Sequence, residues 1–273
     1  MDNALGEFLR ARRELVTPAE AGLPAGNGLR RVRGLRREEV ATLAGISVEY
    51  YLRLEQGRDR SPSAQVIDAI AEVLRLDAEG AAYLTALAAP KPRRRPARRE
   101  PSVSPGLAML LATINVPAIV FDKYGDVLAA NPLARELAPD LAPGVNRLRM
   151  LFTDPGAPGY HPDWEDYTAA VVAHLRAQIG ADLEDERLQA LIDELSVASE
   201  RFRELWARHD VRAARPGPFV LHHPRVGDLE LLVEKFAVTG ADLEALLLHA
   251  EPGSRSAEAL AELESAVAAE FPV

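Results

Sequence analysis

Apolar side chains recur at helical spacing through most of residues 1–89, in five stretches separated by short polar or glycine-rich breaks. Pro18 ends the first stretch, and a loop rich in glycine and proline follows over residues 20–34. The pattern therefore predicts an all-α domain of five helices. The predicted helices cover residues 5–16, 36–44, 47–56, 63–74 and 77–88.

The second and third of these helices have the spacing of a helix-turn-helix. Two helices that cross at a steep angle need a small residue where their backbones approach, and Ala41 meets that need. Four positions later Gly45 suits a turn that requires positive φ. The side chains expected to face inward are Val40, Ala44, Ile46, Tyr51 and Leu54.

This spacing, the five-helix order and the run Leu54-Glu55-Gln56-Gly57 resemble phage-repressor-like, XRE-family DNA-binding domains. The resemblance implies that residues 47–56 enter the major groove of double-stranded DNA, where Val48, Glu49 and Arg53 read base edges. Arg37 matches a phosphate-contacting position. Tyr51 departs from the family, which has a branched aliphatic there. The implied DNA-binding residues are Arg37, Ser47, Val48, Glu49, Tyr50, Arg53, Gln56 and Arg58.

Residues 90–105, PKPRRRPARREPSVSP, hold five prolines and six basic side chains. Proline fixes φ and removes a backbone donor, so this segment predicts a semi-extended linker between two domains. Its arginines fit either a solvated tether or a basic arm along DNA phosphates. The predicted organisation is a helix-turn-helix domain at 1–89, a linker at 90–105 and a second domain at 106–273.

The second domain alternates short apolar strands with helices. Two strands at 117–121 and 127–130 flank a turn, helical stretches fill the middle, and three strands follow at 219–222, 228–236 and 243–249. A closing helix is predicted at 256–270. This order predicts an α+β, PAS-like domain with a five-stranded antiparallel sheet, and a multidomain protein as a whole.

Nearly the whole chain resembles the MmyB-like transcription regulators. The stretches that carry the resemblance are GEFLRARREL, GLRREEVATLAGISVEYYLRLEQGRDRSPS, GDVLAANPLA, NRLRMLFTDP, HPDWEDY, FRELWARHDVR, HHPRVGDLEL and AEPGSRSAEAL. The family has tryptophan before Asn131-Pro132, where this chain has Ala130. The resemblance implies a PAS-like pocket for a small apolar ligand such as a fatty acid, and the alanine implies a ligand that differs in size or identity from that of relatives.

Aromatic and apolar residues of the second domain fit such a pocket, although the same spacing also fits an ordinary core. For a ligand carboxylate at the pocket mouth the candidates are Arg149, Arg208, His209 and Arg212. The predicted ligand-binding residues are Phe121, Met150, Phe152, Trp164, Leu175, Phe202, Trp206, Arg208, His209 and Val233.

Charge supports the division into two domains. The formal net charge of −9 hides a net of +4 in residues 1–100, with 18 basic and 14 acidic side chains. Residues 101–273 carry 14 basic and 27 acidic side chains, a net of −13. A basic front half favours a nucleic-acid partner for that half alone.

Composition argues against several other classes. The chain has no cysteine, its six histidines lack metal-ligand spacing, and we find neither a phosphate-binding glycine loop with lysine nor a Gly-x-Ser-x-Gly elbow. We therefore expect no enzyme, no cofactor and no metal. The longest apolar stretch, 106–121, is too short to span a bilayer, so a cytoplasmic protein without a membrane partner is expected.

The sequence thus predicts a ligand-responsive, DNA-binding transcription regulator. Because helix-turn-helix proteins read paired half-sites, a homodimer is expected. Two alternatives stay open for the second domain: a module used only for dimerisation or protein docking, and an enzyme tethered to DNA.

Overall fold

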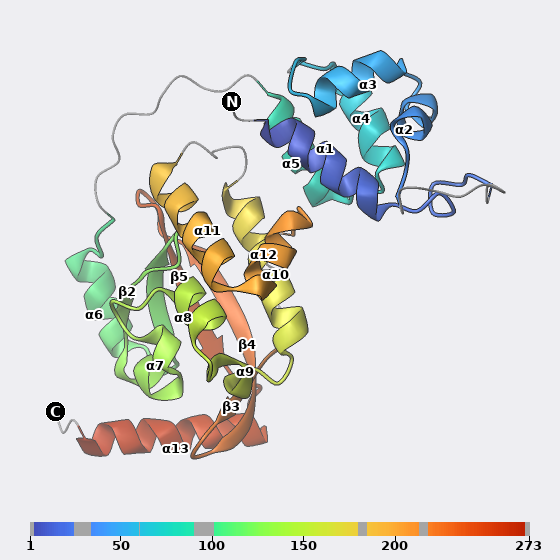
Figure 1. Cartoon of the computed structure of the whole chain (residues 1–273). Coiled ribbons are helices and arrows are strands. Elements are labelled where there is room, and N and C mark those ends of the chain that lie inside the picture. Colours follow the sequence, from blue (N-terminus) through green and yellow to red (C-terminus); the bar gives the residue numbers. More distant parts are fainter. Residues whose placement is uncertain are drawn as a thin grey trace. The chain divides into compact units, whose positions relative to one another are not determined.

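The computed structural model places helices and a single sheet where the hydrophobic pattern predicts them (Figure 1). The structure describes residues 3–24, 34–59, 61–89, 101–179, 185–212 and 218–270. The predicted linker therefore lies mostly outside the described residues, and so does the middle of the loop at 20–34.

The chain divides into two compact units. The first contains residues 1–96 with 170–189 and 201–213, and the second contains 97–169, 190–200 and 214–273. A helical N-terminal region followed by a five-stranded antiparallel sheet with helices is the predicted fold class, which is confirmed.

Five helices form the N-terminal part of the first unit. Buried apolar side chains from all five make one core, in which Phe8, Val40, Tyr51 and Leu84 are at most 1% exposed. Short polar residues cap the helices: Ser47, for example, accepts a hydrogen bond from the Tyr50 amide at 3.1 Å. The helices are α1 (Ala4–Leu15), α2 (Arg37–Leu43), α3 (Val48–Glu55), α4 (Ala64–Val73) and α5 (Ala78–Ala88).

The sheet of the second unit has the strand order β2-β1-β5-β4-β3, with every neighbouring pair antiparallel. The two strands before the helical middle thus join the three strands after it through the pairing of β1 with β5. The strands are β1 (Ala118–Asp122), β2 (Val127–Ala130), β3 (Pro218–His223), β4 (Gly227–Ala237) and β5 (Leu243–His249).

Helices cover both faces of this sheet. One face, with Ile119 and Leu231, packs against α7 (Pro132–Leu137), the 3₁₀ turn η1 (Pro139–Leu141) and α13 (Arg255–Glu270). The opposite face, with Val120, packs against α6 (Pro105–Thr113). The remaining helices are α8 (Arg147–Thr153), α9 (Ala157–Tyr160), α10 (Trp164–Ile179), α11 (Glu186–Ala198) and α12 (Glu200–Ala207).

Buried Asn131 joins the strands to α7. Its Oδ1 accepts hydrogen bonds from the amides of Ala134 and Ala118, at 2.9 and 3.1 Å. Its Nδ2 donates to the carbonyls of Val116 and Ile114. Asn131 therefore caps the start of α7 and also ties that helix start to the chain entering β1.

Candidate nucleic-acid interface and ligand site

The turn between α2 and α3 has the geometry of a helix-turn-helix. Gly45 takes φ = +67°, a conformation that a side chain would strain. The Ile46 amide donates to the Ala41 carbonyl at 2.9 Å, and Ala41 is fully buried where the helices approach. Val40, Tyr51 and Leu54 lie in the core as predicted, while Ala44 and Ile46 are partly buried against it.

The outer side of α3 presents a row of exposed side chains. Val48 is 40% exposed, and Ser47, Glu49 and Arg53 are also exposed. The Arg53 guanidinium carbon lies 5.4 Å from the centre of the Tyr50 ring, an arrangement that orients the guanidinium along the helix. Every residue predicted to contact bases therefore lies on the solvent side of α3. Gln56 and Arg58, which follow the helix, are exposed too.

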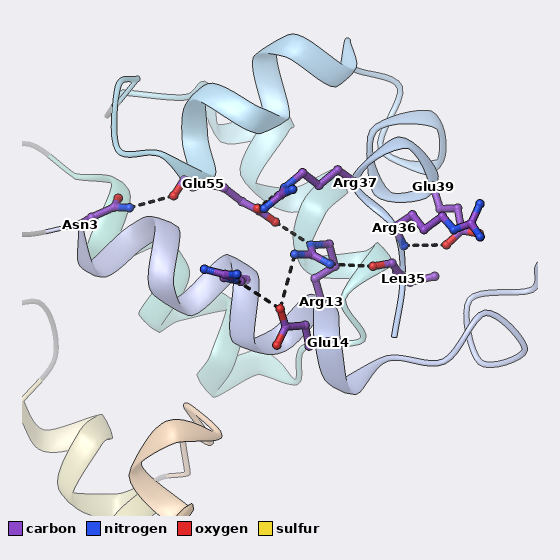
Figure 2. Close-up of polar contacts among 9 residues, drawn as sticks. Asn3, Arg13, Glu14, Leu35, Arg36, Arg37, Glu39 and Glu55 are labelled. Atoms are coloured by element: carbon purple, nitrogen blue, oxygen red, sulfur yellow. Dashed lines mark hydrogen bonds and ion pairs between the residues drawn. The ribbon is translucent and has the colours of Figure 1, made fainter. Parts of the chain in front are cut away.

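A buried carboxylate fixes the end of α3 to the two helices before it (Figure 2). Glu55 Oε1 accepts a hydrogen bond from Arg13 Nε of α1 at 2.6 Å, and Glu55 Oε2 accepts one from Arg37 Nε of α2 at 2.6 Å. Arg13 Nη1 also donates to the Leu35 carbonyl at 2.8 Å, and Asn3 Nδ2 donates to the Glu55 carbonyl at 2.8 Å. One acidic side chain thus links α3 to both α1 and α2.

The electrostatics of this cluster are those of a buried salt bridge. Only 5% of the Arg13 side chain and 3% of the Glu55 side chain are exposed. Burial opposes the charge of Arg13, but the hydrogen bond and negative charge of Glu55 outweigh burial and raise the pKa of Arg13. Burial, followed by the Glu55 charge, raises the pKa of Tyr51. Arg13 therefore keeps its charge beside a neutral Tyr51.

Arg37 contacts both the buried Glu55 and solvent. Its Nε is bound to Glu55, yet 41% of its side chain is exposed. The guanidinium is thus positioned by the protein while part of it faces solvent, which is compatible with the predicted phosphate contact. Sequence reasoning did not identify Glu55 or Arg13 as the groups that position Arg37.

The predicted ligand-binding residues, all from the second predicted domain at 106–273, are divided between the two units. Phe121 and Val233 lie in the core on one face of the sheet, and the rings of Phe152 and Trp164 are 6.4 Å apart. Met150 lines a hollow. These five lie in the second unit, whereas the first unit holds Leu175, Phe202, Trp206, Arg208 and His209.

The predicted residues of the first unit are engaged in several ways. Phe202 and Trp206 stack with ring centres 5.9 Å apart, and Leu175 is buried. His209 takes positive φ, with its ring 6.2 Å from that of Phe8. Burial, then the charges of Arg176 and Arg12, lower the pKa of His209 to about 3, so this imidazole is neutral at physiological pH.

Carboxylates of the protein already bind two of the arginines considered for a ligand head group. Arg149 donates from Nε and Nη2 to the two carboxylate oxygens of Glu194, each at 2.7 Å. Arg208 Nε lies 2.9 Å from Asp210 Oδ2. Arg212 is exposed.

The second unit contains a hollow of about 20 Å³ beside α8 and α9. Its lining residues include Asp140, Met150, Tyr160 and His161. A volume of this size holds roughly one water molecule. A larger apolar molecule therefore requires the lining side chains to move.

The part of the chain that the structure describes contains neither a metal site nor a membrane-spanning helix. No group of three or more histidine or acidic residues there could hold a metal ion. None of the helices there combines the length and the apolar character needed to cross a bilayer.

Two family matches cover most of the chain. Residues 4–84 match the helix-turn-helix domain, in the region that holds α1 to α5. Residues 103–263 match the ligand-binding domain of MmyB-like transcription regulators, which spans the sheet and its helices. No curated protein matches the chain. Because the second match alone covers more than half of the 273 residues, the chain belongs to the family of MmyB-like transcription regulators.

Proposed function

We propose that the protein is a sequence-specific regulator in which α3 reads the major groove of double-stranded DNA. The observation that carries this proposal is the exposed row on α3, which is held in place by the buried Glu55 cluster behind it. Arg53 has the reach and charge to bind a guanine edge, and Glu49 can accept from a cytosine amino group. Half-exposed Arg37 and exposed Gln56 and Arg58 serve as phosphate contacts.

The second half of this proposal is a small apolar ligand in the PAS-like domain, a fatty acid being the candidate. The family match to a ligand-binding domain supports it, and the hollow near Met150 marks a place where the core is incompletely filled. Ligand binding then changes the relative populations of two arrangements of the DNA-binding heads. We infer that the protein acts by binding rather than catalysis, in the cytoplasm.

We also propose that the regulator works as a homodimer, because helix-turn-helix proteins read paired half-sites. Helix α6 supports this idea with Met109 at 68% and Leu110 at 54% exposure, an apolar surface that a second copy can cover. The double variant Met109→Glu/Leu110→Glu is expected to shift the mass measured by sedimentation toward the monomer. An unchanged mass would remove α6 from the dimer contact.

DNA-binding titrations at several salt concentrations test the DNA-reading proposal. The wild-type chain is expected to prefer its operator, isolated by selection from random duplexes. Arg53→Ala is expected to cost about 1–3 kcal/mol on the operator and to relax its specificity. Arg225→Ala, which removes one exposed charge from the second unit, is the matched control. Equal binding of all duplexes by the wild type would contradict the proposal.

A further inference from the structure

Two cationic side chains face the same aromatic ring inside the second unit. The Arg147 guanidinium carbon lies 5.3 Å from the centre of the Phe121 ring, and Lys235 Nζ lies 5.9 Å from it. Neither cation was among the residues expected to bind a ligand. Two positive charges on one ring of a domain interior require an explanation, because like charges repel strongly where water is scarce.

The fold fixes both cations in place. Arg147 is the first residue of α8, and its amide donates to the Gly125 carbonyl in the β1–β2 turn at 2.8 Å. The preceding Asn146 donates from Nδ2 to Asp126 Oδ1 at 2.6 Å. On β4, Lys235 follows Leu231 and Val233 in alternation, so it points to the same face of the sheet as the core.

The protein's own carboxylates do not hold these cations as Glu55 holds Arg13. Among the described residues, Asp140 Oδ2 lies 3.9 Å from Arg147 Nε, and that buried Nε has no hydrogen-bond partner. Glu244 on β5 is the acidic group that acts on Lys235. Burial nevertheless lowers the pKa of Lys235 to about 8, with Arg147 contributing and Glu244 opposing. Negative charge is present around the two cations, since Asp140 and Asp163 act on His161 and Tyr167 and Glu244 acts on Lys235. Among the described residues, however, no carboxylate makes a hydrogen bond to Arg147 Nε.

The surroundings of the two cations combine aromatic rings with polar groups. Buried His161 stacks on Tyr167 with ring centres 4.4 Å apart, and Tyr167 lies 5.4 Å from Phe219. Burial lowers the pKa of His161, so its ring is neutral, and burial raises the pKa of Tyr167, which Arg147 opposes. His161 and Asp140 also line the hollow, which therefore lies next to the Arg147 side of the cluster. Three aromatic rings, those of His161, Tyr167 and Phe219, thus border a region with two cations.

We propose that Arg147 and Lys235 bind the carboxylate of an apolar acid whose chain lies among the aromatic and aliphatic side chains of this core. The proposal rests on the proposed ligand-binding function and assigns the residues that bind the head group of the ligand. A ligand carboxylate between the two cations offers close oxygen acceptors to the unpartnered Arg147 Nε and to Lys235 Nζ. In this assignment Arg147 and Lys235 replace Arg149 and Arg208 as the residues that bind the head group.

Calorimetric titration of the full-length protein with dodecanoic acid and dodecan-1-ol tests this assignment, since the two probes differ only in the charged group. The wild type is expected to bind the acid at least about tenfold more tightly. Lys235→Met and Arg147→Met are each expected to reduce acid affinity about tenfold and to leave alcohol affinity unchanged. Lys123→Met, whose lysine lies over the Tyr124 ring, is the matched control.

A second measurement needs no substitution at the site. The chain has three lysines, Lys91, Lys123 and Lys235, so ¹³C-methylation gives a simple lysine spectrum. Dodecanoate is expected to raise the pKa of the Lys235 amine, read from its resonance, above the value in the ligand-free protein. Dodecan-1-ol is expected to leave this pKa unchanged. Lys235→Met identifies the resonance.

The outcomes separate the two proposals. Equal affinity for acid and alcohol, or variants that retain the wild-type preference, would overturn the head-group assignment and leave apolar ligand binding intact. If neither probe binds the wild type, the proposed ligand-binding function fails and the head-group assignment fails with it.

Discussion

The two parts of the protein each bring two cations together, but only one part supplies a carboxylate between them. In the helix-turn-helix domain, Arg13 and Arg37 each bind a different oxygen of Glu55 at 2.6 Å. In the PAS-like domain, Arg147 and Lys235 lie near the same phenylalanine ring, and Asp140 Oδ2 is 3.9 Å from Arg147 Nε. The first arrangement is complete within the chain, whereas the second has unused capacity for an anion.

This difference distinguishes a positioning device from a binding site. A closed ion cluster stabilises one arrangement of helices and has little to offer an external ligand. An open pair of cations destabilises the domain slightly until an anion arrives, so the ligand gains the interaction that the fold lacks. Experiments that remove one charge at a time should therefore have opposite effects on stability in the two domains.

The largest effect is expected for Glu55→Gln. The amide keeps the shape of the side chain but removes the charge that balances buried Arg13 and half-exposed Arg37. Breaking a buried ion pair from one side typically costs about 3–5 kcal/mol. We expect a loss of that size in the free energy of unfolding of the helix-turn-helix domain, measured by hydrogen exchange of the amides in α1 to α5.

Glu14→Gln is the control for this loss. Glu14 also lies near Arg13, with 3.8 Å between Glu14 Oε1 and Arg13 Nη2, but half of its side chain is exposed. It is expected to cost less than about 1 kcal/mol. A comparable loss in both variants would mean that Glu55 has no special role in the domain.

Arg37→Met is expected to have a smaller effect on stability, about 1 kcal/mol, because Glu55 keeps its bond to Arg13 and the Arg37 side chain is 41% exposed. Its effect on DNA is the informative one. If Arg37 contacts a phosphate, affinity falls nearly equally for all sequences and the salt slope decreases by about 1. A change in sequence preference would assign Arg37 to base readout instead.

Most of the fold could be predicted because hydrophobic periodicity encodes it locally. The helix-turn-helix followed from Ala41 and Gly45, and the strands followed from alternation and turn residues. The ion clusters were missed because a charged residue is ordinarily expected at the surface. For Glu55 a signal existed: it lies four residues after Tyr51 on the inward side of α3, where the helical spacing buries it.

Lys235 carries a similar signal, since strict alternation after Leu231 and Val233 assigns it to the inward face of β4. Arg147 carries no such signal in the sequence. Its position depends on the hydrogen bonds that attach the start of α8 to the β1–β2 turn, and these join residues far beyond the reach of any periodicity. The open cation pair is therefore a tertiary feature, although one of its members could have been found from the sequence.

Lys235→Met is expected to stabilise the PAS-like domain at about pH 7, by roughly 0.5–1 kcal/mol, the opposite sign to Glu55→Gln. Lysine normally titrates near 10.5, but the pKa of Lys235 in the folded protein is about 8. Between these values the unfolded chain binds more protons, so the contribution of Lys235 to stability rises with pH. The gain of the variant over wild type should shrink from about pH 8 to about pH 10.5.

Chemical denaturation of wild type, Lys235→Met and Lys123→Met over this pH range measures the gain. Lys123→Met should follow the wild-type curve. A Lys235→Met variant that is less stable than wild type at about pH 7 would show that Glu244 already balances the lysine, and the contrast with the Glu55 cluster would disappear.

The smallest effect is expected for Arg149→Met. Arg149 is bound by both oxygens of Glu194, and this pair raises the pKa of Arg149 and lowers that of Glu194, the hydrogen bond being the main cause in each case. Both side chains are 46% exposed, however, so solvent screens the interaction. We expect a loss of about 0.5 kcal/mol that diminishes with added salt, and no change in dodecanoic acid affinity. A loss of acid binding would instead place the head group at Arg149. It would show that the ligand competes with Glu194 for an exposed arginine and does not need Arg147 and Lys235.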